Sequence, residues 1–158
     1  MHHPQVSGVL QTLLDKAISD FTRDFYDQIK NGASEVNLAH QLLIKINQYL
    51  PSDTYDTDLD YNRIKFKDVK KSSATGNPIR PDIVIHKRGI KIDNRLVIEI
   101  KRKWTGEIDS KDQEKLEMFT DPLGDYSYDY GLFLAFDIQG IEASPILRWF
   151  KSGRLLLP

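Results

Sequence analysis

The stretches Arg80-Pro81-Asp82-Ile83-Val84-Ile85 and Leu96-Val97-Ile98-Glu99-Ile100-Lys101 decide the fold of this chain. Each contains a short run of β-branched apolar residues, which is the composition of a buried strand. Each also carries a carboxylate where hydrophobic packing alone would not place one, and the second carboxylate follows the first after 17 positions. The two stretches therefore predict adjacent strands, each of which carries a carboxylate side chain.

The carboxylates of Asp82 and Glu99 are expected to meet. Side chains two residues apart share one face of a strand, so Glu99 and Lys101 point to the same side. The connection between the strands holds a glycine and an Asp-Asn pair, which are typical of a hairpin. If the strands pair, Asp82, Glu99 and Lys101 converge on one patch. Two close carboxylates repel each other, and a divalent cation between them would relieve that repulsion.

The pattern Pro81-Asp82, sixteen residues, then Glu99-Ile100-Lys101 resembles the signature of the PD-(D/E)XK nuclease superfamily, also called restriction-endonuclease-like. The resemblance covers residues 34–137. It implies an α/β fold with an α-β-β-β-α-β core, a mixed central sheet flanked by helices, and an extra N-terminal helix. It also implies a metal-dependent nuclease, a hydrolase of phosphodiester bonds in nucleic acid, with DNA as the expected substrate and magnesium or manganese as cofactor.

The same resemblance assigns roles to individual residues. Asp82, Glu99 and the carbonyl of Ile100 would hold the cation, while Lys101 would act with the two carboxylates in catalysis, orienting water and stabilising the transition state. Superfamily members commonly carry an acidic residue on the helix before the first core strand, and Glu35 is the matching position. The alternative is that Glu35 only complements the dipole of its helix.

Positive charge is concentrated around these carboxylates. Residues 62–103 hold 13 Lys and Arg against 4 Asp and Glu, a local charge of +9, whereas residues 1–61 and 104–158 each carry −5. A phosphate backbone favours such a distribution, although lysines also guard exposed sheet edges. The expected nucleic-acid contacts are Lys70, Lys71, Arg80, His86 and Lys103. For His86, a structural role in the core is an equal alternative.

The composition describes a single domain that is not embedded in a membrane. The chain has 158 residues and a mass of 18.3 kDa, which favours one domain over residues 1–158. Within it we expect a helical extension (1–33), the core (34–137) and a C-terminal strand or helix (138–158). No apolar run suits a membrane span, and a cytoplasmic location is expected. The absence of cysteine leaves oxygen and imidazole as metal ligands.

Local patterns predict the individual elements. Apolar spacing predicts a long first helix, and because many members of the superfamily dimerise, this helix is a candidate homodimer interface. On the helix over 109–120, Gln113 or Lys115 is a candidate to reach the metal site, although exposed positions are the default. The expected elements are helices over 5–30, 34–50 (capped by Ser34) and 109–120, a solvated acidic loop over 51–60, strands over 61–69, 80–86, 95–103 and 130–136, and a strand or short helix over 145–157.

Two other functions remain open from the sequence. The chain could be a non-catalytic module with the nuclease fold that binds nucleic acid or a protein partner, but such modules usually lose one of the motif residues. Alternatively, Asp82, Glu99 and Lys101 could form a structural ion-pair cluster in an unrelated α/β domain. Two carboxylates against one lysine leave an acidic excess, which burial would penalise.

Overall fold

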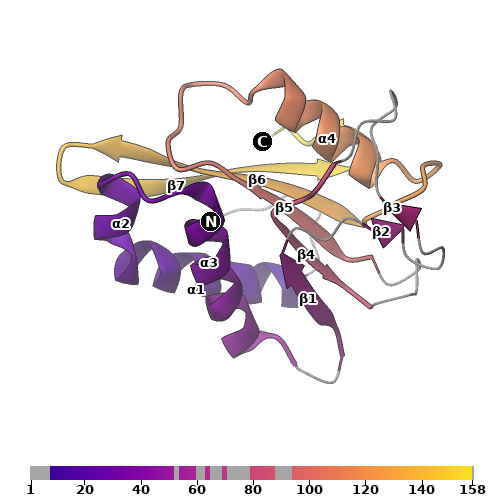
Figure 1. The fold of residues 1–158 in the computed structure, drawn as a ribbon, viewed down its shortest axis with the longest axis horizontal. Helices are drawn as coiled ribbons and strands as arrows, with labels where there is room; N and C mark the ends of the chain where they lie inside the picture. Colours follow the sequence, from indigo (N-terminus) through magenta and orange to yellow (C-terminus); the bar gives the residue numbers. More distant parts are fainter. Residues whose placement is uncertain are drawn as a thin grey trace.

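A mixed six-stranded sheet forms the centre of the protein in the computed structural model, with helices on both faces (Figure 1). The structure describes residues 8–51, 54–59, 63–64, 69–70, 79–87 and 94–157, with the backbone alone at 63–64 and 69–70. The strands of the sheet, in spatial order, are β1 (Asp56–Leu59), β4 (Ile83–His86), β5 (Leu96–Ile100), β6 (Tyr130–Gln139), β7 (Glu142–Lys151) and β8 (Arg154–Leu155). The expected α/β class, a mixed sheet flanked by helices, is confirmed.

The two decisive stretches form adjacent central strands. β4 and β5 pair antiparallel, and β5 pairs parallel with β6. A parallel pair needs a long crossover, and α4 (Ser110–Thr120) lies on that connection. Every residue of β4 and β5 is buried, which explains why both strands read as nearly continuous apolar runs.

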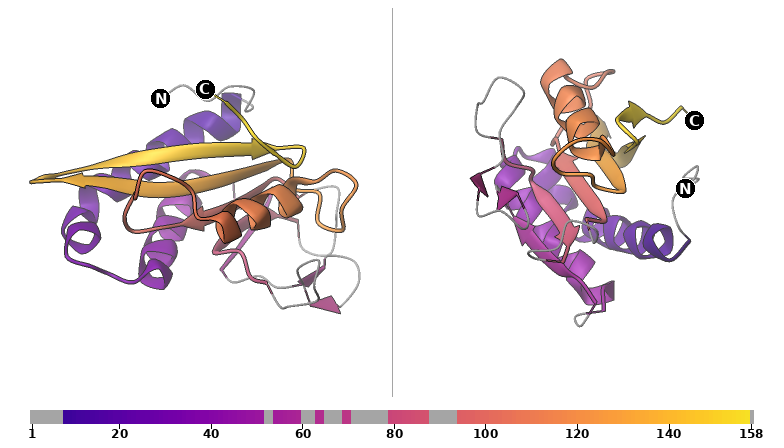
Figure 2. Two further views of the ribbon diagram at one scale, coloured as in Figure 1. Left: turned by 90° about the horizontal axis from the view of Figure 1, so that it is seen from above. Right: turned by 90° about the vertical axis from the view of Figure 1, so that its right-hand side faces the viewer.

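Helices α1 (Gly8–Asp24), α2 (Tyr26–Lys30) and α3 (Glu35–Tyr49) lie together on one side of the sheet (Figures 1 and 2). The predicted N-cap of α3 is confirmed, because the Oγ atom of Ser34 accepts a hydrogen bond from the backbone N–H of Asn37 at 3.2 Å. The buried residues of α1 and α3 recur at helical spacing; they are Leu13, Leu14, Ala17, Ile18, Phe21, Leu38, Ala39, Leu42 and Ile46.

The prediction of one continuous helix over 5–30 is wrong, because the helix is interrupted at Phe25. The backbone of Phe25 has φ −112° and ψ 20°, outside the helical region, and separates α1 from α2. Phe25 still stacks on Phe21, with ring centroids 5.5 Å apart. After the break, the hydroxyl of Tyr26 donates a hydrogen bond to the carbonyl of Ile141 at the tip of the β6–β7 hairpin. This hydrogen bond ties the first residue of α2 to the turn between β6 and β7. Residues 5–7 lie outside the described residues.

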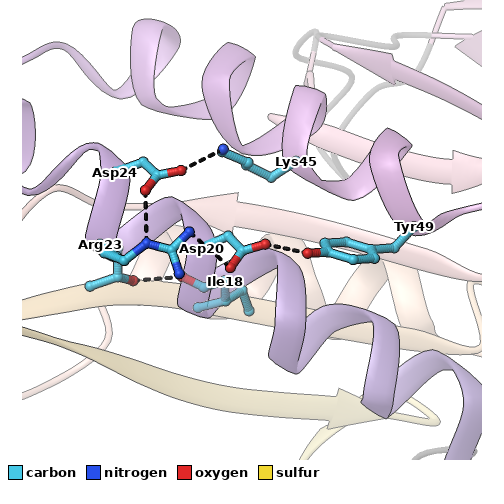
Figure 3. A network of polar contacts seen from close by, with 7 residues as sticks. Ile18, Asp20, Arg23, Asp24, Lys45 and Tyr49 are labelled. Atoms are coloured by element: carbon cyan, nitrogen blue, oxygen red, sulfur yellow. Dashed lines mark hydrogen bonds and ion pairs between the residues drawn. The ribbon is translucent and has the colours of Figure 1, made fainter.

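A polar network joins α1 to α3 on the outside of the helical layer (Figure 3). The carboxylate of Asp24 lies 2.9 Å from Nε of Arg23 and 2.7 Å from Nζ of Lys45. The hydroxyl of Tyr49 donates a hydrogen bond to Asp20. The hydrogen bonds from Arg23 and Lys45 lower the pKa of Asp24 to about 2. These contacts fix how α3, and with it Glu35, sits against α1.

Helix α4 covers the opposite face of the sheet (Figure 2). Leu116 and Phe119 of this helix pack against Val84 of β4 and Val97 of β5. The predicted cap is confirmed, since Oδ1 of Asp109 accepts a hydrogen bond from the N–H of Lys111 at 2.9 Å. Alternate residues of β4 and β5 thus face α4, and the residues between them face α1 and α3.

The expected acidic loop over 51–60 is wrong in part, because Asp56–Leu59 forms the edge strand β1. Its acidic residues suit an edge strand, where charge discourages pairing with other chains. The strand expected over 61–69 is replaced by two short strands, β2 (Arg63–Ile64) and β3 (Val69–Lys70), which pair with each other in a separate two-stranded sheet. The remainder of that segment lies outside the described residues.

The C-terminal residues form strands and no helix within the described range. β7 holds Trp149 and Phe150, which are buried as expected, and β8 adds a short edge strand. β6 extends to Gln139, past the expected core boundary at position 137. In the described residues, no helix has the length and hydropathy needed to cross a membrane.

Candidate active site

Asp82 and Glu99 lie at the same end of the β4–β5 pair. Ile83 is the partner of Ile98, so the antiparallel register places Asp82 across from Glu99 one step further on. Asp82 Oδ2 accepts a hydrogen bond from the backbone N–H of Ile100 at 2.8 Å. This contact fixes the Asp82 carboxylate over the end of β5, next to the predicted partner.

Glu99 is buried on the face covered by α4. It follows Val97, which packs under α4, by two residues and therefore points to the same side. Only 3% of its surface is exposed. Nζ of Lys115 lies 2.9 Å from Oε2 of Glu99, while Oε1 is buried without a hydrogen-bond partner. One oxygen of this carboxylate is thus paired, and the other is not compensated.

The environment of Glu99 disfavours its charged form. Burial is the main cause, and the nearby Asp82 carboxylate adds to it, so that the pKa of Glu99 rises to about 8. The Lys115 ammonium opposes this rise but does not cancel it. An additional positive charge at this position would stabilise the Glu99 carboxylate. A divalent cation is one such charge, and a proton is another.

Lys101 is held at the same end of the sheet by Asp112 of α4. The distance from Lys101 Nζ to Asp112 Oδ2 is 3.3 Å, and the Asp112 side chain is only 10% exposed. Partial burial lowers the pKa of Lys101, but the carboxylates of Asp112, Glu35 and Asp82 outweigh that effect and raise it overall. Lys101 therefore stays charged and lies within electrostatic reach of three carboxylates.

Glu35 is the exposed first residue of α3, on the helical layer opposite α4. It is near enough to Lys101 to raise the pKa of that lysine. Among the residues placed in the structure, no three carboxylate or imidazole side chains gather in a metal-binding arrangement, so the geometry does not itself assign Glu35 to a ligand group. Its expected role as a metal ligand stays a prediction.

The donor set at this strand end fits a hard cation such as Mg²⁺. Asp82 and Glu99 supply two carboxylates, and Oε1 of Glu99 is a buried acceptor that lacks a donor. Mg²⁺ commonly takes one or two protein carboxylates and keeps several waters, so a third side chain is not required. The residues that would hold it are Asp82, Glu99 and the Ile100 carbonyl.

The residues expected to contact nucleic acid differ in how exposed they are. Arg80 and Lys103 are exposed, and the carbonyl of Arg80 accepts a hydrogen bond from Lys115 Nζ at 3.3 Å. The side chain of Lys70 and the whole of Lys71 lie outside the described residues. His86 differs from these lysines and arginines, because it is fully buried.

The buried position of His86 favours its structural alternative. Its Nε2 atom lies 2.6 Å from Oδ2 of Asp58 in the neighbouring strand β1. A side chain with no exposed surface cannot touch a phosphate backbone without rearrangement of β1. Asp58 was expected in a solvated loop, and no local pattern marked it as a partner of His86.

Sequence reasoning also missed Asp112, while it named Lys115 as a candidate. A usable signal was present: Asp112 precedes Leu116 by four residues and Phe119 by seven, so it continues the apolar stripe of α4. An acidic residue on such a stripe faces the sheet. The other candidate, Gln113, bonds Glu117 on its own helix at 2.9 Å.

A cavity of about 810 Å³ lies elsewhere, at the opposite end of β5. Its lining includes Leu10, Leu13, Ile85, Arg95 and Tyr130. Arg95 is engaged there by the Tyr55 hydroxyl at 2.7 Å and by Asp129 at 2.8 Å. This cavity contains none of the motif carboxylates, so it does not belong to the candidate active site.

Comparisons of this chain with protein-family models, with curated proteins and with solved structures gave no match. Its function must therefore be inferred from the side chains at the end of β5 and from the motif that they form.

Proposed function

We propose that this chain is a metal-dependent nuclease that hydrolyses phosphodiester bonds in nucleic acid, with DNA as its substrate. The observation that best supports this is the position of Asp82 and Glu99 across from each other at one end of β4 and β5. Two lysines, Lys101 and Lys115, reach the same end. Paired carboxylates with adjacent lysines suit hydrolysis of a phosphodiester with a hard cation.

The proposal includes the restriction-endonuclease-like topology that the resemblance implies. Along the chain, α3 is followed by three strands of the main sheet (β1, β4 and β5), then by α4 and β6. This succession has the order of an α-β-β-β-α-β core, with α1 and α2 as the N-terminal addition.

The cofactor in this proposal is Mg²⁺ or Mn²⁺, held by Asp82, Glu99 and the carbonyl of Ile100, with Glu35 as a further ligand. When bound, the cation supplies a more acidic water and neutralises charge on the phosphate. Lys101 orients the attacking water and stabilises negative charge in the transition state. Asp112 positions Lys101 through the 3.3 Å ion pair.

The substrate in this proposal is recognised by charge. Residues 62–103 carry +9 within a chain whose net charge is −1, and the exposed Arg80 and Lys103 lie on this segment. Such a segment suits a polyanion and does not select a base sequence. We propose a cytoplasmic location for the nuclease. We expect any homodimer to form through the outer face of α1, because the apolar face of this helix packs in the core.

A second candidate is the non-catalytic module that binds nucleic acid or a protein partner. The contacts of the two lysines favour it: Lys115 contacts Glu99 and Lys101 contacts Asp112, so each lysine already has an acidic partner within the protein. Such a cluster could keep the strand end together without a cation. The module would bind nucleic acid equally well with and without Mg²⁺.

Cleavage of supercoiled plasmid, linear duplex and single strands, with and without Mg²⁺, separates the two candidates. We expect Mg²⁺-dependent cleavage by the wild type and loss of at least 100-fold, about 3 kcal/mol of transition-state stabilisation, in Asp82→Asn and Lys101→Met. Lys111→Met is the matched control, because Lys111 is an exposed lysine on α4 outside the site. It should cleave at the wild-type rate.

Retained cleavage in folded Asp82→Asn and Lys101→Met would refute the assignment of these residues. Absence of cleavage on every substrate, combined with binding of nucleic acid that does not depend on Mg²⁺, would favour the non-catalytic module.

A further inference from the structure

Buried Glu99 has a cation of its own within the protein. Lys115 reaches it from α4, with 2.9 Å between Nζ and Oε2. The same Nζ donates to the carbonyl of Arg80 at 3.3 Å, just before Asp82 in the chain. The Lys115 ammonium therefore bridges the ends of both strands that carry the motif carboxylates.

The position of Lys115 differs from that of a permanently buried ion-pair partner. Its side chain is 24% exposed, whereas that of Glu99 is 4% exposed. A lysine has four rotatable bonds and a strongly hydrated head, so its ammonium can move from the carboxylate to solvent without unfolding the helix. Glu99, in contrast, is buried near the end of the central strand β5.

We propose that Lys115 is an exchangeable partner of Glu99, which pairs with its side chain while no metal is bound and leaves it when a divalent cation binds. This inference rests on the proposed function, since it needs a cation at Asp82 and Glu99. Lys115 is on Oε2 and the unpaired oxygen is Oε1, and a dication and an ammonium on one carboxylate repel each other.

The exchange has a consequence for substrate binding. Lys101 stays paired with Asp112. Among the described residues, the Lys115 ammonium contacts one carboxylate, that of Glu99, and the carbonyl of Arg80, so loss of the Glu99 contact leaves it without an acidic partner. Lys115 is then available to a phosphate at the same strand end. Metal binding would thus release a positive charge towards the substrate while it fills the site.

The reactivity of individual lysines with an amine-acylating reagent tests this exchange directly. The full chain is acylated briefly with and without Mg²⁺, and the modified positions are quantified by peptide mass spectrometry. A paired, partly buried ammonium reacts slowly. Lys111 is the internal control, because it is exposed on the same helix. Calorimetric titration with Mg²⁺ on the same samples reports whether the cation binds, and Asp82→Asn serves as the variant with a damaged metal site.

We expect Mg²⁺ to increase acylation of Lys115 several-fold and to leave Lys111 unchanged. Asp82→Asn should show no increase. If calorimetry detects Mg²⁺ binding that depends on Asp82 while Lys115 reactivity stays constant or falls, the exchange is refuted and the proposed metal site stands. If no binding is detected, the metal site and the exchange are refuted together.

Discussion

Glu99 combines a strand position, nearly complete burial and a single lysine partner. Its pKa is about 8 instead of the ordinary 4.5, so between these pH values the folded state keeps a proton that the unfolded state has released. Folding therefore binds protons over this range, and the contribution of Glu99 to the free energy of unfolding falls as the pH rises from 4.5 to 8. Below this window the contribution is fully present.

Replacement of Glu99 by glutamine should remove this dependence. We expect the free energy of unfolding of Glu99→Gln to vary less with pH than that of the wild type, by on the order of 1.4 kcal/mol for each unit of pKa shift. Urea denaturation at a series of pH values measures it. Glu114→Gln, an exposed carboxylate on α4, is the control and should keep the wild-type slope. Equal slopes in the wild type and Glu99→Gln would contradict the raised pKa.

At the scale of single residues, the sequence predicted which side chains share one face of a strand. Asp82, Glu99 and Lys101 were found because alternation in two short strands places them at one end. Asp58 and Asp112 were missed as partners of His86 and Lys101, since these contacts depend on which element lies beside which. Spacing within a single element carries no such information.

Helix α4 approaches β6 so closely at Gly131 that a Cβ atom there would make unusually tight contacts. A Cβ atom built at this glycine would lie 3.1 Å from Cγ2 of Thr120, 3.2 Å from Cδ2 of Leu116 and 3.3 Å from Cβ of Phe150. Thr120 and Leu116 belong to α4 and Phe150 to β7, and Leu116 and Phe150 are buried in the apolar cluster between α4 and the sheet. The absence of a side chain at Gly131 therefore lets α4, the helix that carries Asp112 and Lys115, pack directly on β6.

Substitution of Gly131 by alanine should therefore destabilise the protein by about 1–3 kcal/mol, because packed neighbours must shift to admit the methyl group. The midpoint of chemical denaturation measures the loss. Gly8→Ala is the matched control, because a Cβ atom there has nothing within 4 Å. A Gly131→Ala variant as stable as the wild type would show that α4 can move away from β6 without loss of packing.

The elements themselves were predictable wherever one pattern dominated. α3 and α4 begin at the predicted caps, and β4, β5 and β6 contain the predicted apolar runs. β1 was missed because its aspartates indicate a solvated loop, and only pairing with β4 makes Asp56–Leu59 a strand. The break at Phe25 was missed because apolar residues keep helical spacing across it.

At the scale of the whole molecule, the candidate active site and the cavity lie at opposite ends of β5. The charged side chains gather where β5 ends, and the cavity opens near Arg95, where β5 begins. The sequence predicted the mixed α/β class and the meeting of β4 with β5. It could not predict that β1 would pair with β4 at the edge of the sheet, since the order of strands across a sheet depends on contacts between distant residues.

Crystals soaked with Mn²⁺ and measured at the manganese absorption edge test the central claim, that Asp82 and Glu99 share a divalent cation. We predict an anomalous peak between the two carboxylates, about 2.1 Å from their oxygens, with the Lys115 ammonium displaced from Glu99. The absence of a peak at this position, with Lys115 still bound to Glu99, would contradict the claim.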